Sequence, residues 1–448
     1  MITLRTRLER TKSENGFTLI EVVVAMMVFM IVSTGVLYTM MSLLSVNRDS
    51  RNRQVAVNLA AEEIDLARDV KDIFVVGAKT TNYTLAAGTA LNGDEYTVTR
   101  TSSWVTSKGD VAPCGTGTGT LRFKLVQVEV TWNGIKGDPV TTETYINPNE
   151  RLNDTSKGSL IIAVTTDHGE PVEKVPVTAT PTSGTTLTGS TDSAGCLFML
   201  GVNPNDFTVK ISSPPGKSYV DMDSNPQPTQ SAHVVAGAAA SLPFTFDPMS
   251  TIRATYSSAS ARVPINLSTS LVSTRKIQTS VTTAATNPRS IVVSSAYTEG
   301  FAVLSGNVNT CWANDPARWE AAPTAIPARL DGELPEPAYA EPGDIVDATV
   351  PMGELTTSMT SANQYLVAVS KNVTTGGQPG CVTQQTLRFS PTPNTVTVAL
   401  PYGSWDIYRG ASTTFSPTSG TRVSTGMTTG ANGTIASGVV TFDPRGVG

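Results

Sequence analysis

Histidine and cysteine are scarce in this chain, which narrows the chemistry it can perform. Among 448 residues there are 2 histidines and 4 cysteines. None of them has the short spacing of a zinc site or a thiol redox motif, so we expect no metal, no cofactor and no enzymatic activity. His168 is expected in a turn and His233 on a strand, each without a ligand role. Four cysteines are also too few to hold a small disulfide scaffold together.

Charged residues are sparse as well. They make up 15% of the chain, against about 25% in a typical soluble domain, and the net charge is −5. Because the basic residues are dispersed and the balance is acidic, we expect no nucleic-acid partner. The abundance of Thr, Ser, Gly, Val and Pro is typical of exported β-rich modules. The length allows two or three domains beyond an N-terminal helix.

One stretch lacks charge almost completely. From Phe17 to Leu44, Glu21 is the only formally charged residue. The run is longer than the roughly 20 residues that a helix needs to cross a bilayer at about 1.5 Å per residue. A carboxylate in such a helix costs about 2.5–3.5 kcal/mol on insertion scales. A membrane anchor with no other task would not be expected to carry this residue, so Glu21 needs a partner.

The segment before the apolar run, residues 1–16, is a basic leader. A basic flank of this kind stays in the cytoplasm. In an ordinary secretory signal the small-residue cleavage site follows the apolar stretch, whereas here Gly16 precedes it. A cut after Gly16 would remove the leader and keep the helix. The charged residues of the leader are Arg5, Arg7, Arg10 and Lys12 against Glu9 and Glu14.

Gly16, the hydrophobic Phe17 and Glu21, the fifth residue after the cut, closely resemble the type IV prepilin signal. The resemblance implies that a prepilin peptidase cleaves between Gly16 and Phe17 and that the new amine of Phe17 is N-methylated. It also implies that Glu21 of one chain neutralises the Phe17 amine of a neighbouring subunit while their helices pack. The alternative is a plain signal anchor in which this motif occurs by chance.

The helix is predicted to continue beyond the membrane. No proline lies between residues 17 and 76, and Gly77 is the first plausible terminator. Apolar residues recur at helical spacing from Val55 to Ile73. We therefore expect one helix over residues 17–76, of which residues 17–44 form the transmembrane segment and filament core.

Residues 77–150 are predicted to form a small antiparallel sheet. The alternation in Leu121–Trp132 slips at Leu125-Val126, which suggests a bulge there. A long helix followed by such a sheet resembles the minor pilins and pseudopilins of the PilV or GspI type. The resemblance implies an α+β pilin-like N-terminal part.

Residues 151–158 are expected to be a linker, followed by all-β sandwich domains. Residues 159–247 resemble the prealbumin-like sandwiches called carboxypeptidase-regulatory-like or Cna-B-type domains, although the first strand lacks the lysine of their internal cross-link. Residues 248–448 are predicted to be β-rich too, with a proline-rich crossover at Ala313–Gly343. A ligand-contacting loop is the alternative for that stretch. The clearest strand patterns here are Val263–Leu267, Ser290–Ser294, Phe301–Leu304, Tyr365–Val369, Thr386–Phe389, Val396–Leu400 and Trp405–Tyr408.

In an exported protein the cysteines are expected to pair. Cys311 and Cys381 both fall in the last region and are the favoured pair. Cys114 with Cys196 would have to bridge two predicted domains. The alternative is that one or both pairs remain free.

Several short motifs suggest chemistry but are incomplete. Gly216-Lys217-Ser218 lacks the first glycine of a phosphate-binding loop, because Ile211 stands there. Asp221, Asp223 and Asn225 have the spacing of a calcium loop, but Pro226 replaces its glycine. Ser273-Thr274-Arg275-Lys276 matches S-x-x-K without the companion motifs of penicillin-recognising enzymes. The aromatic residues Trp312, Trp319, Tyr402, Trp405 and Tyr408 are expected to pack in β-sandwiches rather than to line a ligand surface.

The sequence thus predicts a minor type IV pilin, a structural subunit of a bacterial surface filament with an adhesive role at its tip. Its partners would be other pilin subunits, the prepilin peptidase and the pilus assembly platform. It would lie in the cytoplasmic membrane as a single-pass protein before assembly and on the cell surface afterwards. The alternatives are a pseudopilin of a type II secretion system and a membrane-tethered adhesin or stalk that never enters a filament.

Overall fold

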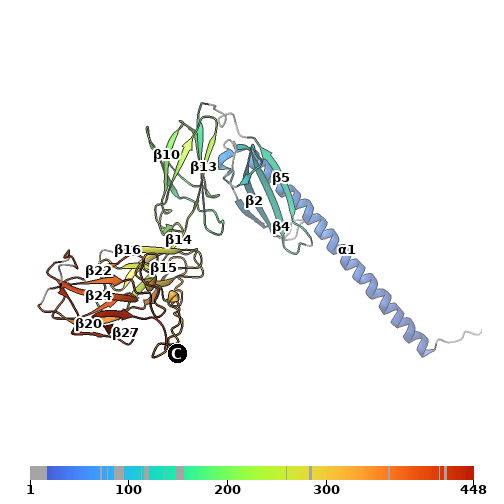
Figure 1. Cartoon of the computed structure of the whole chain (residues 1–448). Coiled ribbons are helices and arrows are strands. Elements are labelled where there is room, and N and C mark those ends of the chain that lie inside the picture. The colour runs from blue at the N-terminus through green and yellow to red at the C-terminus, as the bar shows by residue number, and fades with distance from the viewer. Residues whose placement is uncertain are drawn as a thin grey trace, which may run out of the picture. The chain divides into compact units, whose positions relative to one another are not determined.

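The chain forms a long N-terminal helix followed by β-sheets (Figure 1). The computed structural model describes residues 18–70, 73–77, 79–84, 95–112, 114–115, 121–135, 137–147, 156–258, 260–281, 285–361, 364–412, 414–417 and 421–447. Contacts divide the chain into two units. Unit 1 comprises Met1–Val111 and Leu121–Asn149, and unit 2 comprises Ala112–Thr120 and Glu150–Gly448.

Helix α1 of unit 1 spans Leu19–Arg68, which is 50 residues and therefore about 75 Å. Thr18 caps its start, since the Thr18 hydroxyl accepts from the Glu21 backbone N–H at 3.4 Å. The predicted continuation to Val76 is wrong. Helix α1 ends at Arg68, and Ile73–Val75 form a short 3₁₀ helix, η1.

The backbone carbonyls of the η1 region explain why the helix ends early. The Ile73 carbonyl accepts from the Lys124 ammonium at 3.2 Å, and the Val76 carbonyl accepts from the Ser102 hydroxyl at 2.8 Å. In a continuing helix these carbonyls would bond within the helix instead. Leaving the helix lets Ile73 and Val76 become buried and gives both carbonyls partners in the sheet.

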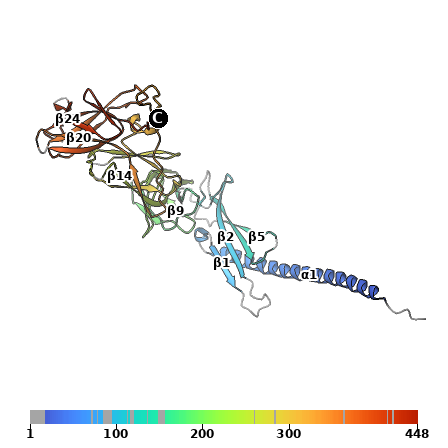
Figure 2. The same ribbon diagram turned by 90° about the horizontal axis from the view of Figure 1, so that it is seen from below.

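An antiparallel sheet in the order β1-β2-β4-β5 packs against the C-terminal half of α1 (Figure 2). Small side chains on α1, Ala56, Ala60 and Ala67, are buried against the valines of the sheet. Because alanine lets backbones approach closely, the helix can lie directly on the sheet. The strands are β1 (Lys79–Thr84), β2 (Glu95–Thr106), β3 (Val111–Ala112, beside β2), β4 (Leu121–Trp132) and β5 (Val140–Ile146).

The bulge predicted at Leu125-Val126 is absent there, and an irregularity lies nearer the start of β4. The register between β2 and β4 is regular through these residues and shifts where Val105 pairs with Phe123 and Thr106 with Leu121. The alternation looked broken because Lys124 occupies a buried position. Its ammonium lies 5.3 Å from the centre of the Trp104 ring, a cation–π distance that helps a lysine remain inside.

The first part of unit 2 is a sandwich of two sheets, β13-β6-β9 and β12-β10-β7-β8, around one apolar core. The strand pair β6 and β13 is parallel, while the other pairs in these sheets are antiparallel. The bounds are β6 (Gly158–Thr165), β7 (Pro176–Pro181), β8 (Leu187–Ser190), β9 (Cys196–Val202), β10 (Asn205–Ile211), β11 (Tyr219–Val220), β12 (Thr229–Val234) and β13 (Ala239–Thr245).

Strand β14 (Asp247–Tyr256) begins the remainder of unit 2, which has two further apolar cores. Around the first core lie the sheets β11-β14-β17, with β19 also beside β14, and β16-β15-β18. Around the second lie β23-β20-β26 and β22-β21-β24-β28-β27, with β25 beside β24. The bounds are β15 (Ser268–Val272), β16 (Ile277–Val281), β17 (Arg289–Ser294), β18 (Ala302–Ser305), η3 (Trp312–Asn314), η4 (Pro316–Arg318), β19 (Ile345–Val350), β20 (Gly353–Ser358), β21 (Tyr365–Lys371), β22 (Thr386–Arg388), β23 (Thr395–Leu400), β24 (Gly403–Gly410), β25 (Thr421–Arg422), β26 (Met427–Thr429), β27 (Gly433–Ala436) and β28 (Val439–Phe442).

The predicted fold class, a long N-terminal helix followed by β-sheet modules, is confirmed. The strand expected at Val263–Leu267 is wrong, because Ile265 and Asn266 lie in a turn. The Asn266 amide donates to the Thr386 carbonyl at 2.8 Å, and its side-chain oxygen accepts from the Arg388 N–H at 2.9 Å. The crossover Ala313–Gly343 contains 3₁₀ turns and isolated bridges rather than strands of a central sheet. The domain boundaries at residues 150, 158 and 247 stay predictions, and residues 151–155 lie outside the described part.

Candidate assembly helix

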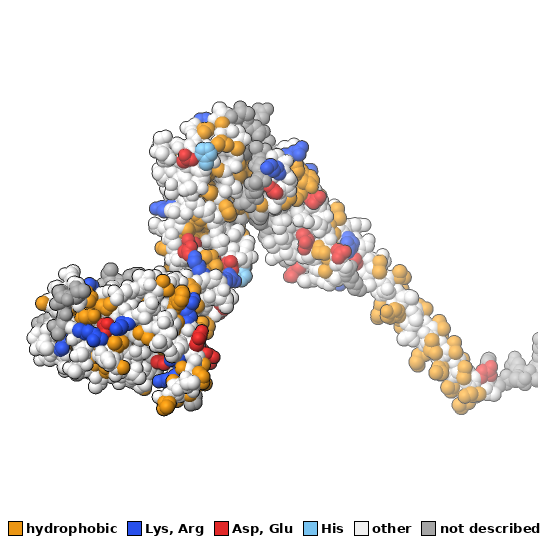
Figure 3. Space-filling model, viewed as in Figure 1, with side chains coloured by type: hydrophobic (Ala, Val, Ile, Leu, Met, Phe, Trp, Pro, Cys, Tyr) orange, Lys and Arg blue, Asp and Glu red, His pale blue; other side chains and the backbone are white. Residues whose placement is uncertain are grey.

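The N-terminal half of α1 is an apolar surface that no other described residue covers. Between Leu19 and Val46 the large hydrophobic side chains are exposed, with Phe29 at 74% and Tyr38 at 77%. Figure 3 shows these side chains along the helix. The helix is long and apolar enough to cross a membrane, with a mean hydropathy of 2.4 over its most apolar window. Such a surface requires lipid or other protein chains around it.

Glu21 lies in the first turn of α1, and its side chain is exposed. The unpaired N–H groups of a helix N-terminus favour a carboxylate there. Among the described residues none forms an ion pair with Glu21. If lipid or other helices surround this carboxylate, a positive charge is needed to neutralise it. That charge would come from outside the described residues. Gly16 and Phe17, the predicted cleavage and methylation sites, lie outside those residues as well.

Hydroxyl groups within the apolar segment bond to the helix itself. The Thr34 hydroxyl donates to the Met30 carbonyl, and the Thr39 hydroxyl donates to the Val36 carbonyl at 2.8 Å. In a medium without water each polar group needs an internal partner. These threonines are therefore compatible with an apolar environment, whereas Glu21 is left with an unneutralised charge.

The C-terminal half of α1 is held on the sheet by buried polar contacts. Glu63, with 2% of its side chain exposed, accepts from Arg100 Nη1 at 2.8 Å, and Lys79 Nζ lies 3.7 Å from its other oxygen. The Tyr96 hydroxyl donates to the Asn52 side-chain oxygen at 3.0 Å. Burial raises the pKa of Tyr83, and the Glu63 charge adds to this effect. The C-terminal half of α1 is thus held in place on the sheet, and the exposed N-terminal half extends beyond it.

The structure brings the four cysteines together in two pairs. Cys311 is bonded to Cys381 inside the core of the last β-region. Cys114 is bonded to Cys196. This bond was expected to join two domains. It does not join the two units, because residues 112–120 belong to unit 2. Both bonds are therefore internal to that unit.

The incomplete motifs have local structural roles. Asp221 Oδ1 accepts from the N–H groups of Asp223 and Asn225, each at 2.8 Å, so it closes a turn. Asp223 pairs with Lys276. The Ser273 hydroxyl accepts from the Lys276 N–H at 3.1 Å in the β15–β16 turn, which is not a helix start. Among the described residues no cluster of His, Cys, Asp or Glu could hold a metal ion.

The histidines and aromatic residues are placed as follows. His233, on β12, has its Nδ1 2.6 Å from Asp206 Oδ1 on β10, with both side chains exposed. His168 is exposed in a turn. Trp319, Tyr402 and Trp405 are buried in the last core, as expected from packing. Trp312 is 42% exposed, with Arg318 over its ring. Tyr408 is half-buried.

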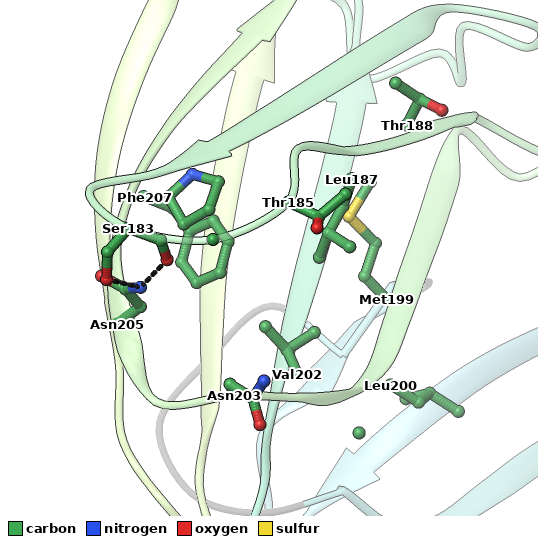
Figure 4. Close-up of a pocket in the computed structure, with 13 residues that line it drawn as sticks. Ser183, Thr185, Leu187, Thr188, Met199, Leu200, Val202, Asn203, Asn205 and Phe207 are labelled. Carbon is green, nitrogen blue, oxygen red and sulfur yellow. Dashed lines mark hydrogen bonds between the residues drawn. The ribbon is translucent and has the colours of Figure 1, made fainter.

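A pocket of about 300 Å³ lies at one end of the first sandwich of unit 2 (Figure 4). Leu187, Met199 and Phe207 supply much of its apolar lining, and the Asn205 amide donates to the Ser183 carbonyl at 2.7 Å. No ionisable side chain is among its lining residues, so it offers no acid or base for catalysis.

Comparison with known proteins agrees with the geometry of α1. Residues 11–37 match the prokaryotic N-terminal methylation motif, so the chain has a prepilin-type N-terminus, as predicted. No curated protein matches the chain.

Similar solved structures include the Bacillus anthracis TIE protein, with 12% identity, coverage of 84% of this chain and 67% of that one, and a TM-score of 0.20. A streptococcal ancillary pilin has 11% identity, 54% and 77% coverage and a TM-score of 0.18. BcpA, the major pilin subunit of Bacillus cereus, has 10% identity, 64% and 95% coverage and a TM-score of 0.17. These TM-scores are low, so only the N-terminal motif and helix relate the chain to pilins.

Neither the cap at Thr18 nor the ion pair of Glu63 with Arg100, which holds α1 on the sheet, was predicted. Thr18 could have been found, because Thr18 and Glu21 have the T-x-x-E spacing of a capping box. Glu63 could not, because Glu62 beside it is equally polar and the sequence does not say which of them faces the sheet.

Proposed function

We propose that this protein is a minor type IV pilin, a structural subunit built into a bacterial surface filament through α1. The prepilin peptidase would cut between Gly16 and Phe17 and methylate the Phe17 amine. Residues 17–44 would hold the chain in the cytoplasmic membrane, with the C-terminal part outside, until the assembly platform moves it into the filament. The observation that carries this proposal is the exposed apolar half of α1, whose one carboxylate, Glu21, lies within the matched prepilin motif.

The role of Glu21 follows from its charge. In lipid an unpaired carboxylate costs about 2.5–3.5 kcal/mol. The Phe17 amine of a neighbouring subunit would supply the opposite charge, and a matched pair recovers much of that cost while setting the stagger between helices. Packing of the apolar helices against each other would cover the remaining surface.

A position at the filament tip is supported by the amount of chain beyond the pilin-like part. Unit 2 includes Glu150–Gly448, which far exceeds unit 1 beyond the helix. Repeating so large a unit at every subunit of a filament would crowd neighbouring copies, whereas a single copy at an end has free space around it. An adhesive or partner-binding role for unit 2 follows from this position.

Replacement of Glu21 by alanine tests the assembly role. We expect Glu21→Ala to be processed and inserted yet to be absent from filaments sheared from the cells, because the helix loses the charge that pairs with the next amine. Glu62→Ala is the matched control, since Glu62 is an exposed carboxylate on the same helix outside the apolar segment. Immunogold labelling of wild-type filaments should mark their ends at low copy number.

Four results would contradict the proposal. Normal recovery of Glu21→Ala in sheared filaments would remove the role of the carboxylate. Mass spectrometry that finds residues 1–16 still attached to the mature chain would exclude processing. Retention of the wild-type protein wholly in membranes of a normally piliated strain would favour a tethered adhesin. Dependence of protein secretion on it, without surface filaments, would favour a pseudopilus.

A further inference from the structure

Asp247 is a buried carboxylate at the point where the chain passes from one β-sandwich of unit 2 to the next (β13, β14 and β15 are labelled in Figure 1). Phe246 belongs to the core of the first sandwich. Strand β14 begins at Asp247 and carries Ile252 into the core of the second sandwich, which the sheets β11-β14-β17 and β16-β15-β18 surround. Since Asp247 is only 2% exposed, its carboxyl group needs either a counter-charge or a proton.

One oxygen of this carboxyl group has a partner and the other has none. Oδ1 accepts from the Asp167 N–H at 2.9 Å, and Asp167 lies in the turn after β6 of the first sandwich. Among the described residues Oδ2 has no hydrogen-bond partner. On β11 the residue opposite Asp247 is the uncharged Val220, and the neighbouring Tyr219 packs its ring 5.6 Å from that of Phe246. The bond from Asp167 therefore joins the two sandwiches through a carboxyl group that is otherwise unsupported.

The charged groups that face Asp247 leave an excess of negative charge. They are Asp167 and His168 from the turn after β6 and Arg275 from the β15–β16 turn. Arg275 Nη1 donates to Asp167 Oδ2 at 2.8 Å, and its Nε lies 3.8 Å from Glu299 in the loop after β17. One guanidinium thus serves three carboxylates among the described residues. Burial raises the pKa of Asp247 and the Asp167 charge adds to this effect, while the Asp167 N–H, His168 and Arg275 oppose it.

The ion pair of Asp167 with Arg275 also joins the two sandwiches, but both side chains are partly exposed. Pairs of this kind are screened by water and contribute about 0–1 kcal/mol. The state of the buried carboxyl group is therefore the larger influence on whether the turn after β6 stays against β14.

A second set of contacts between the sandwiches does not involve the buried carboxyl group. It holds the turn that leads from β11 back to β12 against the second sandwich. The Met222 carbonyl accepts from Gln278 Nε2 at 2.8 Å and from the Tyr297 hydroxyl at 3.0 Å, and Asp223 pairs with Lys276. These contacts can keep the sandwiches joined while the turn after β6 separates from β14.

We propose that the junction between these two sandwiches is a proton-operated hinge, closed when Asp247 carries a proton and opened when its carboxylate ionises and requires water. The closed form binds this proton more tightly than the open form. The closed fraction therefore falls as pH rises from the ordinary carboxyl pKa through the raised pKa of Asp247. The orientation of the second sandwich relative to the first is fixed in mild acid and freer at neutral pH. This inference does not depend on filament assembly, because it concerns unit 2 alone.

Hydrogen exchange of the Asp167 amide tests the hinge, because this N–H donates to Asp247 only in the closed form. The full-length chain in detergent is measured between about pH 4.5 and pH 7.5, and each rate is compared with the intrinsic rate at that pH. We expect the protection of this amide to fall at least about threefold across the range. Because the hinge exposes little surface, this exchange should not respond to low urea, whereas that of the β10 core amides should accelerate.

Asp247→Asn is neutral at every pH and keeps the oxygen that accepts from the Asp167 N–H. In this variant the Asp167 amide should stay protected across the whole range. Asp206→Asn is the matched control, because Asp206 is an exposed carboxylate of the first sandwich that pairs with His233, and it should show the wild-type fall.

Arg275→Gln supplies a second test that does not require Asp247→Asn to fold. The positive charge of Arg275 opposes the rise in the pKa of Asp247. Without that charge the Asp247 proton is held to a higher pH, so the fall in protection of the Asp167 amide should move to higher pH.

Four results would overturn the proposal. Equal protection of the Asp167 amide at both ends of the pH range would show that closing takes up no proton. A wild-type fall in Asp247→Asn would assign the proton to another group, and a fall at unchanged pH in Arg275→Gln would do the same. Acceleration by low urea in step with the β10 amides would show that the junction opens only when unit 2 unfolds.

Discussion

The buried ion pair between α1 and the sheet of unit 1 leads to a quantitative prediction. Glu63 Oε1 lies 2.8 Å from Arg100 Nη1, and only 2% of the Glu63 side chain and 12% of the Arg100 side chain are exposed. In Glu63→Gln the size and one hydrogen-bond acceptor are kept, but Arg100 loses its counter-charge inside the protein. Removing one partner of a buried pair costs about 3–5 kcal/mol. Lys79, at 3.7 Å and half exposed, can rotate into water and adds little.

Native-state hydrogen exchange of the full-length chain measures this cost locally. Since about 1.4 kcal/mol corresponds to a factor of ten, the slowest amides of β2 and β4 should exchange at least roughly 100-fold faster in Glu63→Gln. The double variant Glu63→Gln/Arg100→Met should recover most of the protection, because no unpaired charge remains. Glu62→Gln, one residue earlier and exposed, should exchange as wild type does.

Two outcomes would refute this reasoning. Exchange in Glu63→Gln within about threefold of wild type would show that the pair does not hold the helix on the sheet. Faster exchange in the double variant than in the single would show that Arg100 stabilises unit 1 by another route, for example through the bond from its Nε to the Gly77 carbonyl at 3.1 Å.

Further predictions concern unit 2. Burial raises the pKa of Asp247 above 3.8, and only one of its oxygens has a partner, the Asp167 N–H at 2.9 Å. The folded state therefore binds this proton more tightly than the unfolded state, so stability should fall as pH rises from the ordinary carboxyl pKa through the raised one. Asp247→Asn should lack that fall in thermal-unfolding curves taken between about pH 4 and pH 7; an unchanged profile would exclude Asp247 as its source. Replacement of both Cys114 and Cys196 by serine opens a loop of sequence separation 82 and should lower the unfolding free energy of unit 2 by about 4 kcal/mol in urea titrations. A loss below about 1 kcal/mol would show that this bond constrains little.

The N-terminal helix could be predicted from the sequence because its signals are local. The charge-free run, the glycine before it and the single glutamate all lie within a short stretch, and the helix begins close to the predicted start. Its end could not be predicted, since Ile73 and Val76 keep a helical spacing while they reach the core through a 3₁₀ turn. The partners that stabilise that turn, Ser102 and Lys124, come from strands far along the chain.

In the β-regions, too, features set by local sequence could be predicted, whereas features set by distant strands could not. The strands at Ser290–Ser294 and Val396–Leu400 were located correctly within a residue or so, because short runs rich in apolar and β-branched residues favour buried strands. The burial of Arg289 was not predicted. In the sequence Arg289 precedes an apolar strand and looks like an exposed flank, and its inward direction depends on the pairing of β17 with β14.

The uncovered length of α1 has an energetic consequence for how a subunit leaves the membrane. The buried positions of the helix begin at Asn52, and every large apolar side chain from Leu19 to Val46 is open. Exposing that many side chains to water would cost on the order of tens of kcal/mol. In the proposed assembly, a subunit therefore would not be extracted from lipid before it stacks. Each step out of lipid would coincide with a step onto a neighbouring helix, so that the apolar side chains stay covered throughout.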